Sequence, residues 1–301
     1  MRNTIVILFF ISKTAVCQIA IPSTKTADSL FQSQNWKKAK QAYEAVLTDT
    51  TINALAWNRL AYSNFNLKLN SDAIICYKKA ISQNPVPGLK PVIYLRLSRV
   101  LAITNDTKNA LIALDSAVAC GYSNTKELDT LSEFKKLRKM DEFIKLEKKA
   151  YLNANPCMLN KQAREFDFWV GEWDVFVTNT KQYVGHSLIQ IISGGCAILE
   201  NWESPNSNGK SINFIDPVTN KWKQSWAGNY ADGIQEFANG EYKDDAMRFT
   251  FESTDAKGLK TIGRFMFFNQ GVNQVRQFNE TSVDGGNTWT TNYDFTYIRK
   301  K

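Results

Sequence analysis

Residues 57–85 read WNRLAYSNFNLKLNSDAIICYKKAISQNP, and they contain the pattern that indicates the fold of the N-terminal half of the chain. Its aromatic, aliphatic and small side chains recur at helical spacing: Trp57, Leu60, Ala61, Ala73, Tyr77 and Ala80. The pattern predicts two amphipathic helices with small residues at the points where the helices approach most closely. Neither helix buries its apolar face alone, so the pair is expected to pack against further pairs.

Part of the pattern recurs at a spacing of 34 residues. Ala39, Tyr43 and Val46 each lie 34 positions before their counterparts Ala73, Tyr77 and Ala80. A third, looser copy follows at a spacing of 37 residues: Tyr94, Leu97, Ser98, Leu101, Ala110, Leu114 and Ala117. With Pro85 behind its second helix, the second copy resembles the tetratricopeptide repeat, and this resemblance implies a helical solenoid. In that family the first helices form a concave face that binds extended peptides. The resemblance assigns partner binding to five residues: Asn58, Tyr62, Phe65, Asn66 and Arg99.

The chain begins with the layout of a secretory signal. Residues 1–17 combine Arg2 with an apolar run from Ile5 to Ile11 and end in small or neutral residues. We therefore expect an exported protein, periplasmic or secreted. Lipidation of Cys17 is less favoured than simple cleavage, because the preceding residues make a poor lipobox. No later segment has the roughly 20 apolar residues that span a bilayer, so no transmembrane segment is expected.

The remaining chain divides into two expected domains. Helical repeats cover residues 18–150, and an amphipathic segment from Leu128 to Leu146 caps them. Residues 151–164 lose the helical period and are expected to form a linker. Residues 165–301 form the C-terminal domain.

Charge is divided unevenly between the two halves. Residues 1–156 carry 22 Lys and Arg against 12 Asp and Glu, whereas residues 157–301 carry 15 against 17. The net charge of +8 thus arises in the helical half. Because the lysines are scattered and the chain is expected to be exported, we interpret them as a solvated helix surface and expect no nucleic-acid partner.

Four cysteines follow the signal: Cys76, Cys120, Cys157 and Cys196. They include no C-x-x-C pair, and the chain has 1 histidine, His186, so neither a zinc site nor another metal site is expected. An oxidising compartment permits a Cys157–Cys196 disulfide, and the sequence leaves this bond open.

From Phe166 onward, short alternating segments rich in aromatic and β-branched residues lie between Gly, Asn and Asp. Trp222, Gln224 and Trp226, for example, alternate with two lysines and a serine. This alternating pattern predicts eight to ten antiparallel strands. The fold class is therefore α+β multidomain, with a helical solenoid followed by an up-and-down β-barrel. A β-sandwich is the alternative.

Residues 166–175 read FDFWVGEWDV. Gly171-Glu172-Trp173 resembles the G-x-W of the first strand in lipocalin-like (calycin) barrels. The resemblance implies that Trp173 closes the floor of the barrel and that a basic residue of the last strand, Arg299, packs over its ring.

Residues 282–289 read SVDGGNTW and resemble the Asp-box found on hairpins of sialidases and other β-propellers. A single copy in a short chain predicts a structural hairpin. Asp284 is expected to bond the turn backbone, Gly285 and Gly286 to adopt positive φ, and Trp289 to cover the turn.

Six of the eight tryptophans lie in the barrel half. Small barrels often enclose one ligand, so the aromatic residues indicate either a filled core or a pocket, and both alternatives remain open. Seven residues are candidates for ligand binding: Glu200, Trp202, Gln224, Trp226, Arg276, Gln277 and Glu280. No cofactor is expected, since a haem would depend on His186 as axial ligand.

These observations favour an exported, non-enzymatic binding or scaffold protein, with a protein or peptide partner on the repeats and a small apolar or amphipathic ligand in the barrel. The alternative is a hydrolase-type enzyme that acts on a small substrate or glycan in the barrel mouth through Glu200, Glu280 and Arg276. No catalytic residue is assigned. His186 and Ser187 do not form a pair, because adjacent strand residues point to opposite faces.

Overall fold

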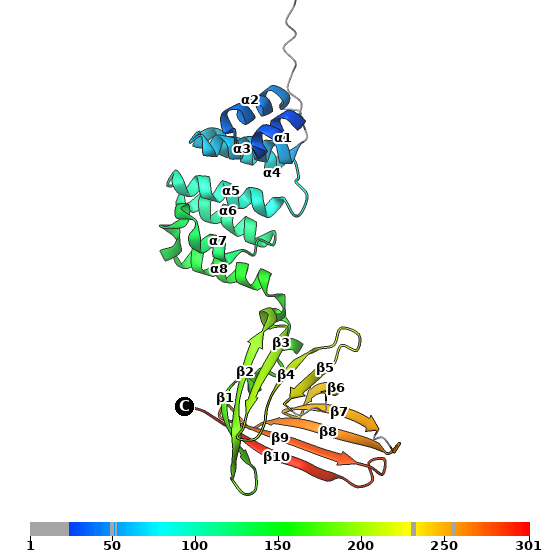
Figure 1. The fold of residues 1–301 in the computed structure, drawn as a ribbon. Coiled ribbons are helices and arrows are strands. Elements are labelled where there is room, and N and C mark those ends of the chain that lie inside the picture. The colour runs from blue at the N-terminus through cyan, green and yellow to red at the C-terminus, as the bar shows by residue number, and fades with distance from the viewer. Residues whose placement is uncertain (1–23, 49–50, 52, 230–232, 255–256) are drawn as a thin grey trace, which may run out of the picture. The chain divides into compact units, whose positions relative to one another are not determined.

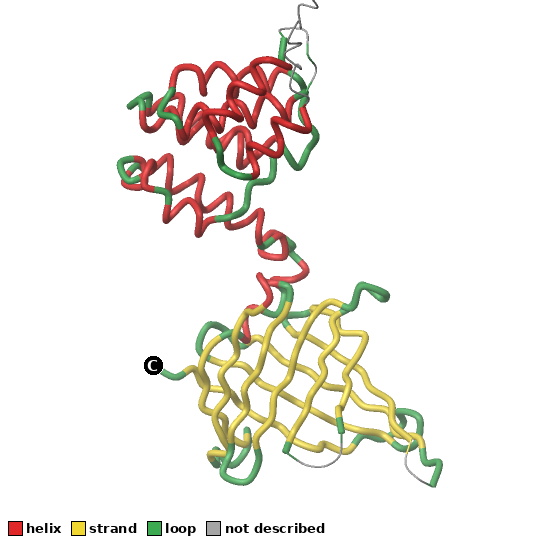
Figure 2. The backbone as a smooth tube through the Cα atoms, turned by 45° about the horizontal axis from the view of Figure 1, so that its top comes forward, coloured by secondary structure: helices red, strands yellow, loops and turns green. Residues whose placement is uncertain are grey.

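The computed structural model describes residues 24–48, 51, 53–229, 233–254 and 257–301. The expected signal, residues 1–17, lies outside these residues. The chain divides into two compact units, Met1–Ala150 and Tyr151–Lys301. The first is helical and the second is built of β-strands (Figures 1 and 2).

Eight α-helices form in chain order among the described residues: α1 Thr24–Gln32, α2 Trp36–Val46, α3 Ala54–Asn66, α4 Asn70–Ser82, α5 Lys90–Ile103, α6 Thr107–Ala119, α7 Thr125–Thr130 and α8 Asp141–Ala154. Several start at a residue that caps the helix: the side chains of Asn35, Asn53, Asp106 and Asn124 each accept a hydrogen bond from a backbone N–H three residues on. None of the helices described is long and apolar enough to cross a membrane.

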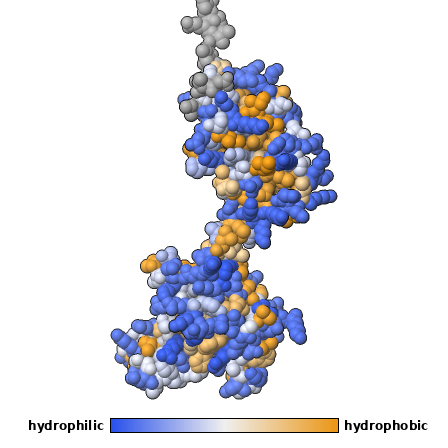
Figure 3. All heavy atoms as spheres, turned by 180° about the vertical axis from the view of Figure 1, so that it is seen from behind, coloured by the Kyte–Doolittle hydropathy of each residue, from blue (hydrophilic) through white to orange (hydrophobic). Residues whose placement is uncertain are grey.

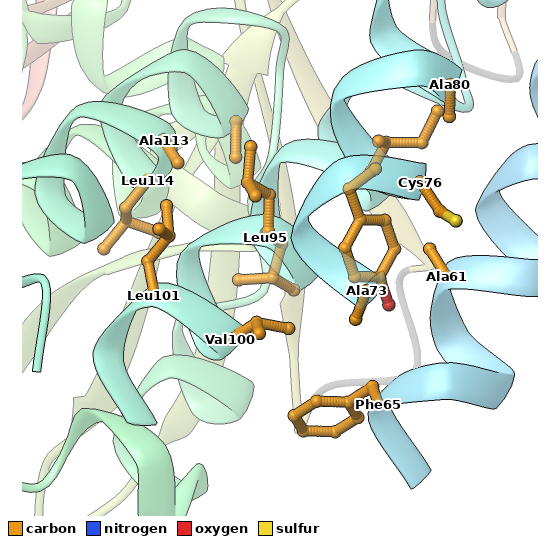
Figure 4. Packing of buried hydrophobic residues seen from close by; sticks show 14 of the residues in the cluster. Ala61, Phe65, Ala73, Cys76, Ala80, Leu95, Val100, Leu101, Ala113 and Leu114 are labelled. Atoms are coloured by element: carbon orange, nitrogen blue, oxygen red, sulfur yellow. The ribbon is translucent and has the colours of Figure 1, made fainter. Parts of the chain in front are cut away.

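Small side chains let consecutive helices pack closely, as the pattern predicts. Ala61 of α3 and Ala73 and Ala80 of α4 have 0% exposure, and Cys76 has 7%. Figure 4 shows these residues between the helices, beside larger side chains of the next pair such as Leu95. The N-terminal half is therefore a stack of helix pairs with one continuous apolar core.

The amphipathic segment behind α6 is buried as expected but is broken into pieces. Leu128 of α7, Phe134 and Leu137 of two short 3-10 turns, and Phe143 and Leu146 of α8 are all buried. Helix α8 continues to Ala154, so the first residues of the expected linker are helical.

Ten strands follow: β1 Gly171–Val177, β2 Tyr183–Ile192, β3 Ala197–Glu203, β4 Asn208–Ile215, β5 Trp222–Gly228, β6 Ile234–Lys243, β7 Ala246–Thr254, β8 Lys260–Asn269, β9 Gln274–Ser282 and β10 Thr290–Arg299. Each pairs antiparallel with its neighbours in sequence, and β1 pairs with β10 to close the barrel. Closure excludes the sandwich alternative and leaves no free edge among these strands.

One end of the barrel is closed by packed aromatic rings. Phe166 and Trp169 precede β1 and lie against Trp173, Trp222 and other rings of the barrel core. The Trp173 ring has 0% exposure, and its Nε1–H donates to the Trp169 carbonyl oxygen over 2.8 Å. This cluster forms a filled floor.

The expected cation-π contact over this floor is confirmed. The Arg299 guanidinium carbon lies 4.2 Å from the Trp173 ring centroid. Its Nη1 donates to the Val170 carbonyl oxygen, and a Cβ on Gly171 would lie 2.0 Å from that same nitrogen. Gly171 also has a φ of +147°, so this position favours glycine on two grounds.

A disulfide joins Cys157 to Cys196, two residues of the barrel unit that are 39 positions apart. Cys157 lies in a 3-10 turn, Pro156–Leu159, within the expected linker, and Cys196 directly precedes β3. Part of the expected linker is thus bonded to the barrel. Cys76 and Cys120 are free.

The hairpin between β9 and β10 has the predicted chemistry. The Asp284 carboxylate accepts hydrogen bonds from the backbone N–H groups of Asn287 and Thr288 at 3.0 and 2.9 Å. Gly285 and Gly286 have φ of +71° and +95°, and Trp289 donates to the Gly286 carbonyl oxygen. The Asp-box of this chain is a structural turn.

Candidate functional site

Above the aromatic floor, the barrel encloses a cavity of about 380 Å³. Twelve described residues line it: Glu200, Trp202, Ser207, Gln224, Trp226, Gln235, Phe237, Phe265, Gln277, Tyr293, Phe295 and Tyr297. Five of the seven residues expected to bind a ligand are among them. The volume lies in the range of small-molecule sites, so the barrel is only partly filled by its own side chains.

Two expected ligand-binding residues, Arg276 and Glu280, lie on the outer face instead. Along β9 the buried positions alternate as Val275, Gln277 and Asn279, so the residues between them point outward. The Arg276 guanidinium pairs with the Asp294 carboxylate through two hydrogen bonds of 2.8 Å.

Glu280 pairs with Arg264 on the outside at 3.3 Å. The constellation required by the hydrolase alternative therefore does not form, because Glu200 is inside the barrel and its two expected partners are outside. The strands of the barrel wall lie between Glu200 and the two outer residues, Arg276 and Glu280.

Glu200 is the centre of a polar cluster in the cavity. Its side chain projects from β3 with 3% exposure. One carboxylate oxygen accepts a hydrogen bond from the Ser187 hydroxyl of β2, and the other accepts one from the Ser211 hydroxyl of β4, each at 2.9 Å. The register places these three residues on one face, because Glu200 is opposite Ser211 and two positions from Trp202, the residue paired with Ser187.

Further polar side chains extend the cluster around the barrel. The Gln224 amide donates to Asn213 Oδ1 at 2.7 Å, and the Tyr297 hydroxyl donates to Gln277 Oε1 at 3.2 Å. Tyr297 also lies 3.5 Å from the Glu200 carboxylate. Among described residues, neither Gln224 Oε1 nor Gln277 Nε2 has a protein hydrogen-bond partner, so both are available to a ligand.

Burial controls the protonation of this cluster. It raises the pKa of the Glu200 carboxyl to about 7, against the lowering effect of the hydrogen bonds from Ser211, Ser187 and Tyr297. Burial also raises the pKa of the Tyr293 and Tyr297 hydroxyls, and the nearby Glu200 charge adds to both shifts. At neutral pH the tyrosines are therefore neutral, whereas Glu200 exchanges between its neutral and charged forms.

Aromatic rings form the rest of the cavity wall. The ring centroids of Phe237 and Phe265 are 4.5 Å apart, and Tyr293 stacks on Phe295 at 5.0 Å. Trp226 lies over Gly209, where a Cβ would come within 2.4 Å of its ring. The cavity lining thus combines a polar cluster around Glu200 with aromatic rings from several strands.

His186 lies on the outer face of β2, where its Nε2 is 3.1 Å from a Glu172 carboxylate oxygen. Its neighbour Ser187 points into the barrel, as alternation predicts. A haem in the cavity therefore has no histidine ligand from this residue. Within the described ranges, no group of three His, Cys, Asp or Glu side chains is placed to hold a metal ion.

The expected partner-binding residues of the helical unit lie together on α3 and α5, but at different depths. Asn58 and Phe65 are buried, with 2% and 8% exposure, whereas Tyr62, Asn66 and Arg99 are half-buried. Arg99 is held by Glu133 at 2.7 Å and lies 5.2 Å from the Phe65 ring centroid.

Arg96, which the sequence pattern does not single out, stacks 4.3 Å from the Tyr62 ring centroid and donates to Asn58 Oδ1. On the face drawn in Figure 3, hydrophobic side chains gather in patches over the helical unit. Of the five expected residues, the half-buried Tyr62, Asn66 and Arg99 are the ones that a partner can reach.

Sequence reasoning missed the residues that hold Glu200. Ser187, Ser211 and Tyr297 come from three other strands, and no local pattern marks them. Period-two alternation identifies the polar side chains of β4 as one face, but only the pairing of β3 with β4 brings them to Glu200.

No protein-family model matches the chain, and no curated protein matches it. Among solved structures, the "Crystal structure of MamA" matches with a TM-score of 0.36 and 20% sequence identity, over 43% of this chain and 74% of that chain. The site geometry is therefore the basis for a functional proposal.

Proposed function

We propose that this chain is an exported, non-enzymatic binding protein whose lipocalin-like barrel holds one small apolar or amphipathic molecule. The observation that carries the proposal is the cavity of about 380 Å³, whose lining contains both hydrogen-bonding groups and aromatic rings. Binding sites for small molecules have this composition, in which apolar walls supply affinity and a few polar groups fix orientation.

The position of the polar groups supports binding rather than bond cleavage. Glu200 is the carboxyl that lines the cavity, and no second carboxyl among the described residues lies beside it. Acid-base cleavage of a glycoside commonly uses two carboxyl groups across the bond. A lone buried carboxyl among amides and hydroxyls is better suited to holding a polar group of a ligand.

We propose in addition that the helical half is a tetratricopeptide-type solenoid that docks a protein or peptide. The stack of helix pairs and the half-buried Tyr62, Asn66 and Arg99 on neighbouring first helices support this role. A peptide on this face would contact the exposed side of the Tyr62 ring and the Asn66 amide.

Binding by the barrel is tested with a neutral fluorescent probe, N-phenyl-1-naphthylamine. The full chain should bind about one probe with saturation, and excitation of tryptophan should transfer energy to it. Trp226→Ala removes one of the aromatic rings that line the cavity and should weaken probe binding roughly tenfold.

Trp289→Ala is the matched control, because Trp289 packs on Arg264 and does not line the cavity. It should leave probe affinity unchanged. Equal losses in the two variants, or binding that never saturates, would contradict the proposed site.

A further inference from the structure

The charges of the barrel are divided between its two faces. Outside, Arg264 pairs with Glu280, Arg276 with Asp294 and Lys223 with Glu236. Inside, Glu200 is the one carboxyl among the described lining residues, and none of those residues carries a positive charge. The cavity therefore contains a carboxyl group without a cationic partner from the protein.

The Glu200 carboxylate also has capacity for a further hydrogen bond. Its two oxygens offer about four lone-pair sites, and the hydroxyls of Ser187 and Ser211 occupy one site on each oxygen. Tyr297, at 3.5 Å, is a weak third donor. A donor on a ligand can therefore bond the carboxylate without displacing either serine.

Aromatic rings complete the surroundings of this group. Trp202, Trp226, Tyr293 and Phe295 line the same cavity as Glu200. The faces of such rings attract organic cations, and they do so most strongly where water is excluded. A buried carboxylate beside several rings is complementary to a cation with an apolar body, because the ion pair and the rings together offset part of the cost of burying both charges.

We propose that the barrel selects organic cations, namely protonated or quaternary amines with an apolar body, and that Glu200 pairs with the nitrogen. This inference rests on the proposed function, since it names the class of ligand for the same cavity. Gln224 and Gln277 supply hydrogen bonds beside the nitrogen, and the aromatic rings of the lining cover the apolar part.

Three indole compounds of nearly equal shape test the inference on the unmodified full chain by calorimetry. Tryptamine is a cation, tryptophol is neutral and indole-3-acetate is an anion. Tryptamine should bind at least about 30-fold more tightly than tryptophol, and indole-3-acetate should bind more weakly than both.

Glu200→Gln keeps the size of the side chain and removes its charge. It should reduce tryptamine affinity by about 30-fold or more and leave tryptophol affinity within about threefold. Glu280→Gln, on the outer face, is the matched control and should change neither. If the variant does not fold, the comparison of the three compounds on the wild-type chain still decides the question.

A second readout is pH. The titratable groups that face Glu200 are Tyr293 and Tyr297 of β10, and Ser187, Ser211 and Gln277 face it without titrating at these pH values. With the pKa of Glu200 at about 7, tryptamine affinity should fall about 15- to 30-fold from about pH 8 to about pH 5.5. Tryptophol affinity should stay level.

The outcomes separate the two proposals. If tryptophol or indole-3-acetate binds as tightly as tryptamine, the cation inference is overturned and the barrel remains a binding module. If the three compounds and N-phenyl-1-naphthylamine all fail to bind, both the inference and the proposed function are overturned.

Discussion

Replacing Glu200 by glutamine should make the barrel more stable at neutral and alkaline pH in the absence of a ligand. The side chain is 3% exposed, and burial raises the pKa of its carboxyl from 4.5 to about 7. Since each tenfold change in a protonation equilibrium is worth about 1.4 kcal/mol, ionised Glu200 costs the folded state roughly 3 kcal/mol relative to the neutral form. Glutamine retains the shape and can still bond Ser187 and Ser211, but it never ionises.

The sign of the pH dependence follows from proton binding. Below about pH 4.5 the carboxyl is neutral in both states, so its contribution to stability is fully present. Between about pH 4.5 and pH 7 the unfolded chain loses the proton and the folded barrel keeps it, so the free energy of unfolding decreases as pH rises. Above that window the loss is complete and the contribution is constant.

The assay is urea unfolding of the full chain at several pH values, followed by tryptophan fluorescence, since six of the eight tryptophans lie in the barrel half. The free energy of unfolding of Glu200→Gln minus that of wild type should increase by roughly 3 kcal/mol across the window. Glu280→Gln should show no such increase. A difference between Glu200→Gln and wild type that does not change with pH would show that Glu200 does not ionise at a higher pH in the folded barrel than in the unfolded chain.

Three further predictions concern the fold. Replacing Cys157 and Cys196 together by alanine opens a loop with a sequence separation of 39 and should lower the free energy of barrel unfolding by up to about 4 kcal/mol, measured by urea unfolding. Arg299→Ala removes the contact with the Trp173 ring and a hydrogen bond at the barrel floor, and should cost about 1–2 kcal/mol in the same assay. Arg99→Ala breaks a half-buried ion pair and should destabilise the helical unit by about 1–3 kcal/mol, measured by the loss of helical circular dichroism on heating.

Each of these variants has a control that leaves the contact intact. Cys120→Ser changes a free, exposed cysteine, Lys301→Ala removes an exposed charge beyond β10, and Lys149→Ala breaks an exposed ion pair. None should change stability measurably. A control that destabilises as much as its partner variant would contradict the role assigned to that contact.

The sequence predicts the helical half well because its signals are local. Ala61, Ala73 and Ala80 recur at helical spacing, and a helix brings such residues to one face without any distant contact. The break between α7 and α8 is harder to predict, because Leu128 and Phe143 satisfy one apolar pattern whether the chain between them is straight or folded.

The candidate site is only partly predictable because its faces depend on strand register. Gln277 and Arg276 are adjacent, so no more than one of them can point into the barrel, and alternation alone does not choose between them. The serines that hold Glu200 lie 13 and 11 residues from it in sequence and meet it only through strand pairing. The unpaired carboxyl is therefore a feature of the assembled barrel.

Native mass spectrometry tests whether the barrel holds one small ligand beside Glu200. The full chain, purified gently from its own host, is weighed before and after denaturation and again after incubation with tryptamine. We expect a small molecule that is lost on denaturation, or a bare chain that gains one tryptamine. A chain whose native mass equals its denatured mass before and after incubation would contradict a ligand site in the barrel.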